Sequence, residues 1–300
     1  MNTAEIAAKV ALLKKIYVSY PPHIEFHQRC EYLIELGRAT RGQPQNGMRV
    51  LAPSGSGKSA ATKAFIRKFE AQTPRTETHV PLVYIPLEEG TTSKKLMSSI
   101  LDFFGDKYSS NGNEQVLKNR VKACFERFGT DLLFIDEVQH LDYRNSGANN
   151  ATDSLKRFLD DGVVPIVFLG VDEAKAFFTK NIQLGSRLIA PSDLKPLDAR
   201  NRSDRSLLAS YAASLDQAIV QKGILTEPSA LRDPWVIQCL HSVTDGVIGR
   251  VSRLLEVALV IALRRGATRI ERYDLALAVD SWGIANGVAK LNPFRREERQ

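Results

Sequence analysis

The chain has 300 residues, of which 43% are hydrophobic and 25% are charged. This composition excludes a disordered or fibrous protein and fits one large globular domain, or a large domain with a small one. Lys and Arg number 41 against 34 Asp and Glu, and the resulting net charge of +7 favours a polyanionic partner.

The first 45 residues predict a helical N-terminal extension. They hold no signal-peptide core, because Lys9, Lys14 and Lys15 interrupt the apolar residues. No apolar run in the chain reaches the roughly 18 residues that a membrane-spanning helix needs. The three cysteines lie far apart in no metal-binding pair, which is typical of reduced thiols in a cytosolic protein. We therefore expect a cytoplasmic protein with no membrane partner.

Five short apolar runs alternate with helical patterns through the middle of the chain. Strands that are buried on both faces read as continuous apolar runs, and helices between them imply parallel strands. We predict an α/β fold in which a parallel five-stranded sheet is flanked by helices. The five runs are MRVLA (48–52), PLVYIPL (81–87), DLLFIDE (131–137), VPIVFLG (164–170) and RLIAPSDL (187–194).

After Leu197 the periodicity is that of helices alone, which predicts a small all-helical lid domain. The last residues, LNPFRREERQ, read as a charged tail. The predicted domains are an N-terminal helical extension at 1–45, a P-loop α/β domain at 46–197, a helical lid domain at 198–288 and a charged C-terminal tail at 289–300.

The segment LAPSGSGKSAATKAF (51–65) leads from the first strand through a glycine loop into a helix. This is the context of a phosphate-binding loop, whose backbone N–H groups converge on phosphate oxygens at a helix N-terminus. Lys58 would neutralise the β and γ phosphates of ATP, and Ser59 would hold Mg²⁺. Ala52 stands where G-x-x-x-x-G-K-[ST] has its first glycine. The predicted ATP contacts from the loop are Ser54, Gly55, Ser56, Gly57, Lys58, Ser59 and Ala60.

The run DLLFIDE places Asp136 and Glu137 at the C-terminal end of the third strand, where ligands bind in open parallel sheets. Asp136 would complete the Mg²⁺ shell through water, and Glu137 would orient and polarise the water that attacks the γ-phosphate. The alternative is a strand that ends in two solvated acids. A small-molecule kinase needs no water-activating carboxylate, so the pair favours ATP hydrolysis over phosphoryl transfer.

Three further residues are candidates for sensing or stabilising the γ-phosphate. Asp172 is the polar candidate at the tip of the fourth strand, where Val171 precedes it. Arg187, just before the fifth run, would reach the γ-phosphate of a neighbouring subunit, the alternative being a surface salt bridge. Arg250 opens an apolar helix of the lid domain and would fold onto the phosphates; Arg253 is the alternate, and a helix-surface role is open for both.

In order and spacing, the loop APSGSGKS, the strand LLFIDE, Arg187 and Arg250 resemble an AAA+ ATPase. Within that superfamily, FIDEVQHL with its following polar loop, VPIVFLGVDEA and DGVIGRVSRLLEVA resemble the TniB subgroup of transposition ATPases, relatives of TnsC and more distantly of MuB. The resemblance covers roughly residues 20–285. This sequence departs from the pattern at Ala52 and Val171.

The resemblance implies an ATPase that oligomerises on duplex DNA in the presence of ATP, as a ring or a helix, with each nucleotide lying between Lys58 of one subunit and Arg187 of the next. It also implies that the assembly marks a target, recruits a DDE transposase, often with a TniQ-type adaptor, and associates with the bacterial nucleoid. The DNA contacts are expected at Lys94 and Lys95, on a helix start after the second strand, and at Asn113 in the turn SSNGNEQ. The alternative for the two lysines is a solvated helix start, and the resemblance favours Lys94 as a contact.

Two other functions stay open. A replication loader or initiator of the AAA+ class would share every site residue, although no winged-helix pattern follows the helical domain. A nucleotide-switched signalling scaffold would bind ATP with little hydrolysis, and Glu137 argues against it. Phosphate release measured with and without duplex DNA would discriminate the scaffold from a DNA-dependent ATPase.

Overall fold

The computed structural model describes residues 1–141 and 151–295. The chain divides into two compact units. We call Pro22–Ser54 together with Lys58–Leu194 the sheet unit. The helical unit combines Met1–Pro21, Gly55–Gly57 and Lys195–Gln300. The polar loop 142–150 and the last five residues of the predicted tail, 296–300, lie outside the described residues.

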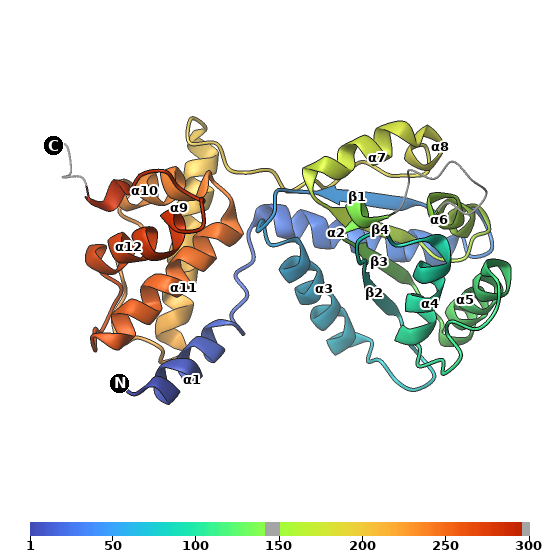
Figure 1. Cartoon of the computed structure of the whole chain (residues 1–300), viewed down its shortest axis with the longest axis horizontal. Coiled ribbons are helices and arrows are strands. Elements are labelled where there is room, and N and C mark those ends of the chain that lie inside the picture. Colours follow the sequence, from blue (N-terminus) through green and yellow to red (C-terminus); the bar gives the residue numbers. More distant parts are fainter. Residues whose placement is uncertain (142–150, 296–300) are drawn as a thin grey trace. The chain divides into compact units, whose positions relative to one another are not determined.

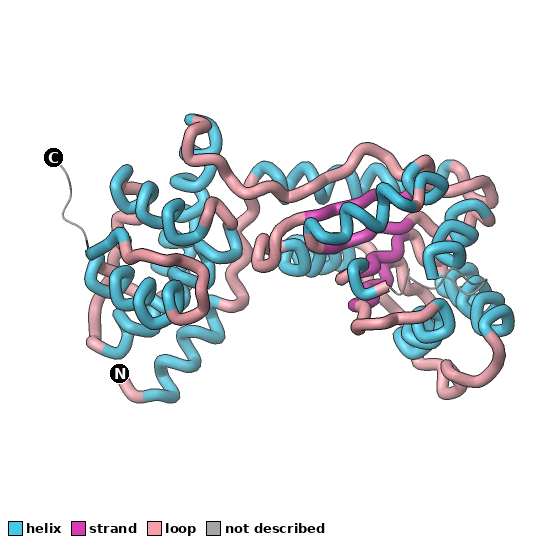
Figure 2. Tube along the Cα trace, turned by 45° about the horizontal axis from the view of Figure 1, so that its top comes forward, coloured by secondary structure: helices cyan, strands magenta, loops and turns pink. Residues whose placement is uncertain are grey.

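The sheet unit is built on parallel strands in the order β1-β4-β3-β2 (Figures 1 and 2). The register pairs Gly47 with Ile166, Leu133 with Ile166 and Leu82 with Leu132. All the C-terminal strand ends therefore meet at one edge, as the predicted α/β fold requires. The strands are β1 (Gly47–Leu51), β2 (Leu82–Pro86), β3 (Leu132–Asp136) and β4 (Ile166–Gly170).

The prediction of a fifth strand at 187–194 is wrong, since the described sheet has four strands. The segment begins to pair beside β1, where Gly47 N–H donates to the Arg187 carbonyl at 3.0 Å and Gly47 carbonyl accepts from Ile189 at 2.8 Å. A parallel ladder would next need an N–H from residue 191, which is proline and has none. Ser192 donates to the Arg49 carbonyl in its place, at 3.1 Å, so the register slips by one residue.

Successive residues of each strand face opposite cores, as the period of two dictates. On one face, Phe134 and Val167 pack against helices α2 and α3. On the other, Ile135 and Phe168 pack against α4 to α8. The helices of the sheet unit are α2 (Pro21–Ala39), α3 (Lys58–Gln72), α4 (Ser93–Phe103), α5 (Glu114–Phe128), α6 (Ala151–Asp160), α7 (Lys175–Lys180) and α8 (Ile182–Gly185).

The helical unit has one core, to which the first helix of the chain contributes Leu13. Phe294, from the segment predicted as a tail, is buried and packs edge-on against Trp235. In the described part of the chain, no helix is both long and apolar enough to span a membrane. The helices of this unit are α1 (Thr3–Leu13), α9 (Arg202–Gln221), α10 (Pro234–Thr244), α11 (Ile248–Arg264) and α12 (Arg272–Ala278).

Candidate nucleotide-binding site

The predicted phosphate loop connects β1 to α3. Gly55 and Gly57 have φ angles of +77° and +94°, which non-glycine residues rarely adopt, so the turn depends on glycine at both positions. Lys58, the first residue of α3, is buried and donates a hydrogen bond from Nζ to the Ala52 carbonyl at 3.0 Å. Burial lowers the pKa of Lys58, and the negative charges of nearby carboxylates, Glu137 first, oppose this shift. The ammonium group has three donors, so two stay available to a phosphate.

Ser59 and Asp136 lie together although 77 positions separate them in the sequence. Ser59 Oγ donates to Asp136 Oδ2 at 2.8 Å, and Tyr84 Oη donates to the same oxygen at 2.5 Å. Asp136 ends β3 and is 2% exposed, so these hydroxyl groups compensate its burial. A hydroxyl and a carboxylate beside a phosphate loop form the oxygen set that Mg²⁺ prefers when it bridges to nucleotide phosphates. The residues present therefore fit ATP with Mg²⁺.

Glu137 has φ of +60° and ψ of +44°, the left-handed region that non-glycine residues occupy at an energetic cost. Its Oε2 accepts a hydrogen bond from Gln139 Nε2, and Gln139 Oε1 accepts from the Val171 N–H at 3.3 Å. One amide thus connects the end of β3 to the residue that follows β4. Gly170 leaves room for this bridge, because a Cβ there would lie 3.2 Å from Gln139 Oε1 and 2.7 Å from Val138 Cγ2.

Sequence reasoning missed Tyr84 and Gln139. Tyr84 was visible as the one hydroxyl within the apolar run PLVYIPL, but its contact with Asp136 depends on β2 lying next to β3. Gln139 follows Glu137 by two positions, and only the short 3-10 turn Val138–His140 brings its amide back to that carboxylate.

No hydrogen bond or ion pair shown among the described residues joins the remaining γ-phosphate candidates to Ser59, Asp136 or Glu137. Asp172 begins a 3-10 turn after β4 and is exposed. Arg187 forms a two-pronged ion pair with Asp160, in which Nη2 lies 2.8 Å from Oδ2. Arg250, in the helical unit, lies 3.3 Å from the Asp245 carboxylate. The predicted roles of these residues stay predictions.

Lys94 and Lys95 lie in the first turn of α4, and both are exposed. Lys95 forms an ion pair with Glu88 at 2.6 Å and lowers the pKa of that carboxyl. Asn113 is the N-cap of α5, where its side chain accepts from Val116 N–H at 3.0 Å. Lys95 and Asn113 therefore have partners. The Lys94 side chain makes no hydrogen bond or ion pair shown in the described part of the chain.

A parallel sheet that carries a phosphate loop after β1 and an acid pair at the end of β3 fits the AAA+ class of P-loop ATPases, which the motifs resemble. Solved structures of this class are similar to the chain across most of its length. The Aeropyrum pernix ORC1 protein in complex with DNA matches with a TM-score of 0.62 and 20% identity, covering 91% of this chain and 69% of that one. The ORC2 protein of the same organism, in its ADP form, has a TM-score of 0.64 and 14% identity, with 90% and 72% covered.

Cdc6p from Pyrobaculum aerophilum is similar as well, with a TM-score of 0.61, 14% identity and coverage of 90% of this chain and 70% of that one. At such identities the likeness establishes the fold alone. The comparison with curated proteins gives no match. The family model described as bacterial TniB protein matches residues 11–196. The chain belongs to the TniB family, and the resemblance stated from its motifs is confirmed.

Proposed function

We propose that this protein is an ATP-hydrolysing, DNA-binding ATPase that oligomerises on duplex DNA, selects targets for transposition and recruits a DDE transposase, with a TniQ-type adaptor as a further partner. The observation that carries the proposal is the pairing of Ser59 and Asp136 at 2.8 Å, with Glu137 as the next residue of the chain. Membership of the TniB family supports the transposition role.

In the proposed ATP hydrolysis, each side chain of the site has its own task. Lys58 and the loop N–H groups bind the phosphates, and Ser59 with Asp136 holds Mg²⁺, which supplies neutralisation of charge on the phosphate oxygens. One oxygen of Glu137 accepts a hydrogen bond from Gln139, and the other, which no hydrogen bond shown among the described residues engages, would accept a proton from the attacking water. A hydrogen-bonded carboxylate of this kind keeps its orientation between turnovers.

The proposed assembly depends on Arg187, which is paired with Asp160 in the structure. The partners in the Arg187–Asp160 ion pair are 28% and 38% exposed. Exchange of Asp160 for the γ-phosphate of a neighbouring copy would replace one anionic acceptor of Arg187 by another, so the guanidinium keeps a charged partner throughout. Each copy then adds Lys94 to one DNA-facing surface, and repeated phosphate contacts give strong binding that weakens with salt and tolerates sequence changes.

The test is the substitution Glu137→Gln, which removes the proton acceptor and keeps the shape. We expect ATP binding to persist, hydrolysis to fall by about 10²–10⁴-fold, and DNA complexes to outlast those of the wild type in filter retention. Glu126→Gln, on the exposed side of α5, is the matched control and should behave as wild type. Complexes that dissociate at the wild-type rate would refute the role of Glu137. Phosphate release that duplex DNA does not stimulate would favour the signalling scaffold.

A replication loader or initiator is the second candidate, because the fold is similar to that of ORC1 and Cdc6p. The two functions differ in their partner rather than in their nucleotide chemistry. Retention of a purified DDE transposase on DNA only in the presence of this protein and ATP supports the transposition role. Retention of a replicative helicase under the same conditions, without the transposase, supports the loader.

A further inference from the structure

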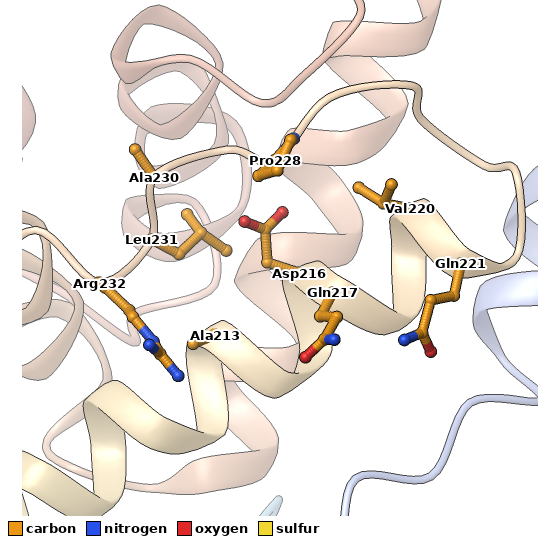
Figure 3. A pocket seen from close by; sticks show the side chains of 9 residues that line it. All are labelled: Ala213, Asp216, Gln217, Val220, Gln221, Pro228, Ala230, Leu231 and Arg232. Atoms are coloured by element: carbon orange, nitrogen blue, oxygen red, sulfur yellow. The ribbon is translucent and has the colours of Figure 1, made fainter.

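A pocket of about 490 Å³ opens in the helical unit, between α9 and the segment 228–232 (Figure 3). This volume is in the range of small-molecule and side-chain binding sites. Apolar side chains form most of the wall, and the carboxylate of Asp216 lies among them, directed between Pro228 and Leu231. None of the residues that line the pocket belongs to the predicted ATP site, so the two sites use different residues.

Asp216 is 5% exposed, and the backbone and side chain of Ser229 both form hydrogen bonds with its carboxylate. Its Oδ2 accepts a hydrogen bond from the Ser229 backbone N–H at 2.8 Å. Its Oδ1 is buried and has no hydrogen-bond partner within the described residues. A buried carboxylate oxygen without a donor costs free energy, which a bound group with N–H donors would recover. Burial also raises the pKa of Asp216, which is the sign of a charge held out of water.

The wall that faces Asp216 is held rigidly. Ser229 Oγ accepts from the Ile270 N–H at 3.0 Å, and the N–H groups of Thr226 and Glu227 both donate to the Thr268 carbonyl at 3.1 Å. Ala230, in the same wall, has φ of +53°, a left-handed conformation that non-glycine residues rarely adopt. The surrounding structure therefore maintains a strained backbone at the pocket, and a preorganised site binds without an ordering cost.

The charged group directed into the pocket is the Asp216 carboxylate (Figure 3). The guanidinium of Arg232 is directed away from the Asp216 carboxylate, toward Ala213 (Figure 3). Gln217 and Gln221, one helical turn apart on α9, are exposed at the mouth and offer both donors and acceptors. These amides match both the donors and the acceptors of a polypeptide backbone, whereas a protonated amine could use their oxygens alone.

We propose that this pocket binds the lysine or arginine side chain of a partner protein, with the cationic group on the Asp216 carboxylate and the partner backbone against Gln217 and Gln221. The long apolar stem of such a side chain packs on Val220, Pro228 and Leu231, as lysine and arginine stems do on apolar surfaces. The assignment goes beyond the proposed ATPase function and does not depend on it.

The test uses the full chain, labelled with ¹⁵N and titrated with N-acetyl-lysine amide, N-acetyl-arginine amide and the uncharged N-acetyl-norleucine amide. We expect the two cationic probes to shift amide signals of residues 213–232 and the norleucine probe to bind at least about tenfold more weakly, as a charge-assisted hydrogen bond requires. Asp216→Asn keeps an oxygen for the Ser229 N–H and should lose the same factor. Glu227→Gln removes one negative charge on the exposed surface near the pocket and should bind as wild type.

Three results would overturn the proposal. Equal binding of the norleucine probe would make the pocket merely apolar. Unchanged binding by Asp216→Asn would remove the carboxylate from the site. Spermidine that binds more tightly than both amino-acid probes would assign the pocket to a free amine rather than a protein partner. Thermal melting of each variant is recorded first, and a variant that melts as wild type but fails to bind supports the proposal.

Discussion

The amide bridge of Gln139 gives the sharpest test of how the water-activating carboxylate is held. Gln139 donates to Glu137 Oε2 and accepts from the Val171 N–H, so it contacts both the acid end of β3 and the tip of β4. We perturb it with Gln139→Glu, which nearly keeps the size of the side chain and replaces the donor by a second carboxylate. Gln139→Ala removes the bridge without adding charge.

The magnitude follows from the contact. Two unit charges about 4 Å apart interact by about 4 kcal/mol at an effective dielectric constant of 20. Glu137 and Gln139 are both partly exposed, so solvent screening reduces the repulsion between two carboxylates at these positions. Because the two carboxyls then titrate as a pair, the proton acceptor is lost at a higher pH. Gln139→Ala loses a hydrogen bond to a charged group, about 1.5–3 kcal/mol, and kcat should fall by about tenfold or more.

The assay is phosphate release as a function of pH at saturating ATP, with ATP affinity measured separately. For Gln139→Glu we expect the acidic limb of the profile to move to higher pH, with ATP affinity little changed. The control is Gln115→Glu, which makes the same chemical change on the exposed side of α5. A Gln139→Glu profile that superimposes on that of Gln115→Glu would refute the reasoning, since a bridge of purely structural importance would lower the rate without moving the limb.

Two further predictions concern DNA binding and stability. Lys94→Ala should weaken DNA retention and reduce the slope of log affinity against log salt by about 0.9 per bound copy. The control Lys63→Ala, on the exposed side of α3, should change neither. Equal salt slopes for the two variants would remove Lys94 from the interface. His23 is buried, and burial followed by the charge of His27 lowers its pKa to about 4. Because the unfolded chain takes up this proton at about pH 6.5, stability is lost as the pH falls from 6.5 toward 4, by about 2 kcal/mol at pH 5. Urea unfolding should show a flatter pH dependence for His23→Gln, and an identical dependence would contradict the assignment.

The four observed strands were predictable because each is buried on both faces and therefore reads as an apolar run. The predicted run 131–137 contains the observed strand Leu132–Asp136, and the predicted 81–87 contains Leu82–Pro86. The run 187–194 has the same apolar character, but a composition pattern does not register that Pro191 lacks the N–H which the ladder needs. The hydrophobic pattern thus predicted the sheet and the helices that cover it. The missing N–H of Pro191 explains why the sheet has four strands and not five.

The candidate site divides in a similar way. Ser59 and Asp136 were predictable from motifs, since Ser59 lies in the first turn of the helix after the glycine loop and Asp136 ends an apolar strand. Tyr84 was not, because its hydrogen bond to Asp136 depends on which strand neighbours β3. Gln139 was not either, because a single 3-10 turn reverses its amide toward Glu137. Side-chain contacts between neighbouring elements need the topology before they can be derived.

The slip at Pro191 has a consequence for how copies of this chain can meet. Beside β1, the donors and acceptors of the sheet margin are already occupied by an irregular segment, with the Asp193 carboxylate accepting from the Leu51 N–H at 2.9 Å. A foreign extended peptide finds no open template on that flank. The sheet of one molecule therefore cannot continue into the next through β1. At this edge, contacts between copies must be made by side chains and not by backbone hydrogen bonds between strands.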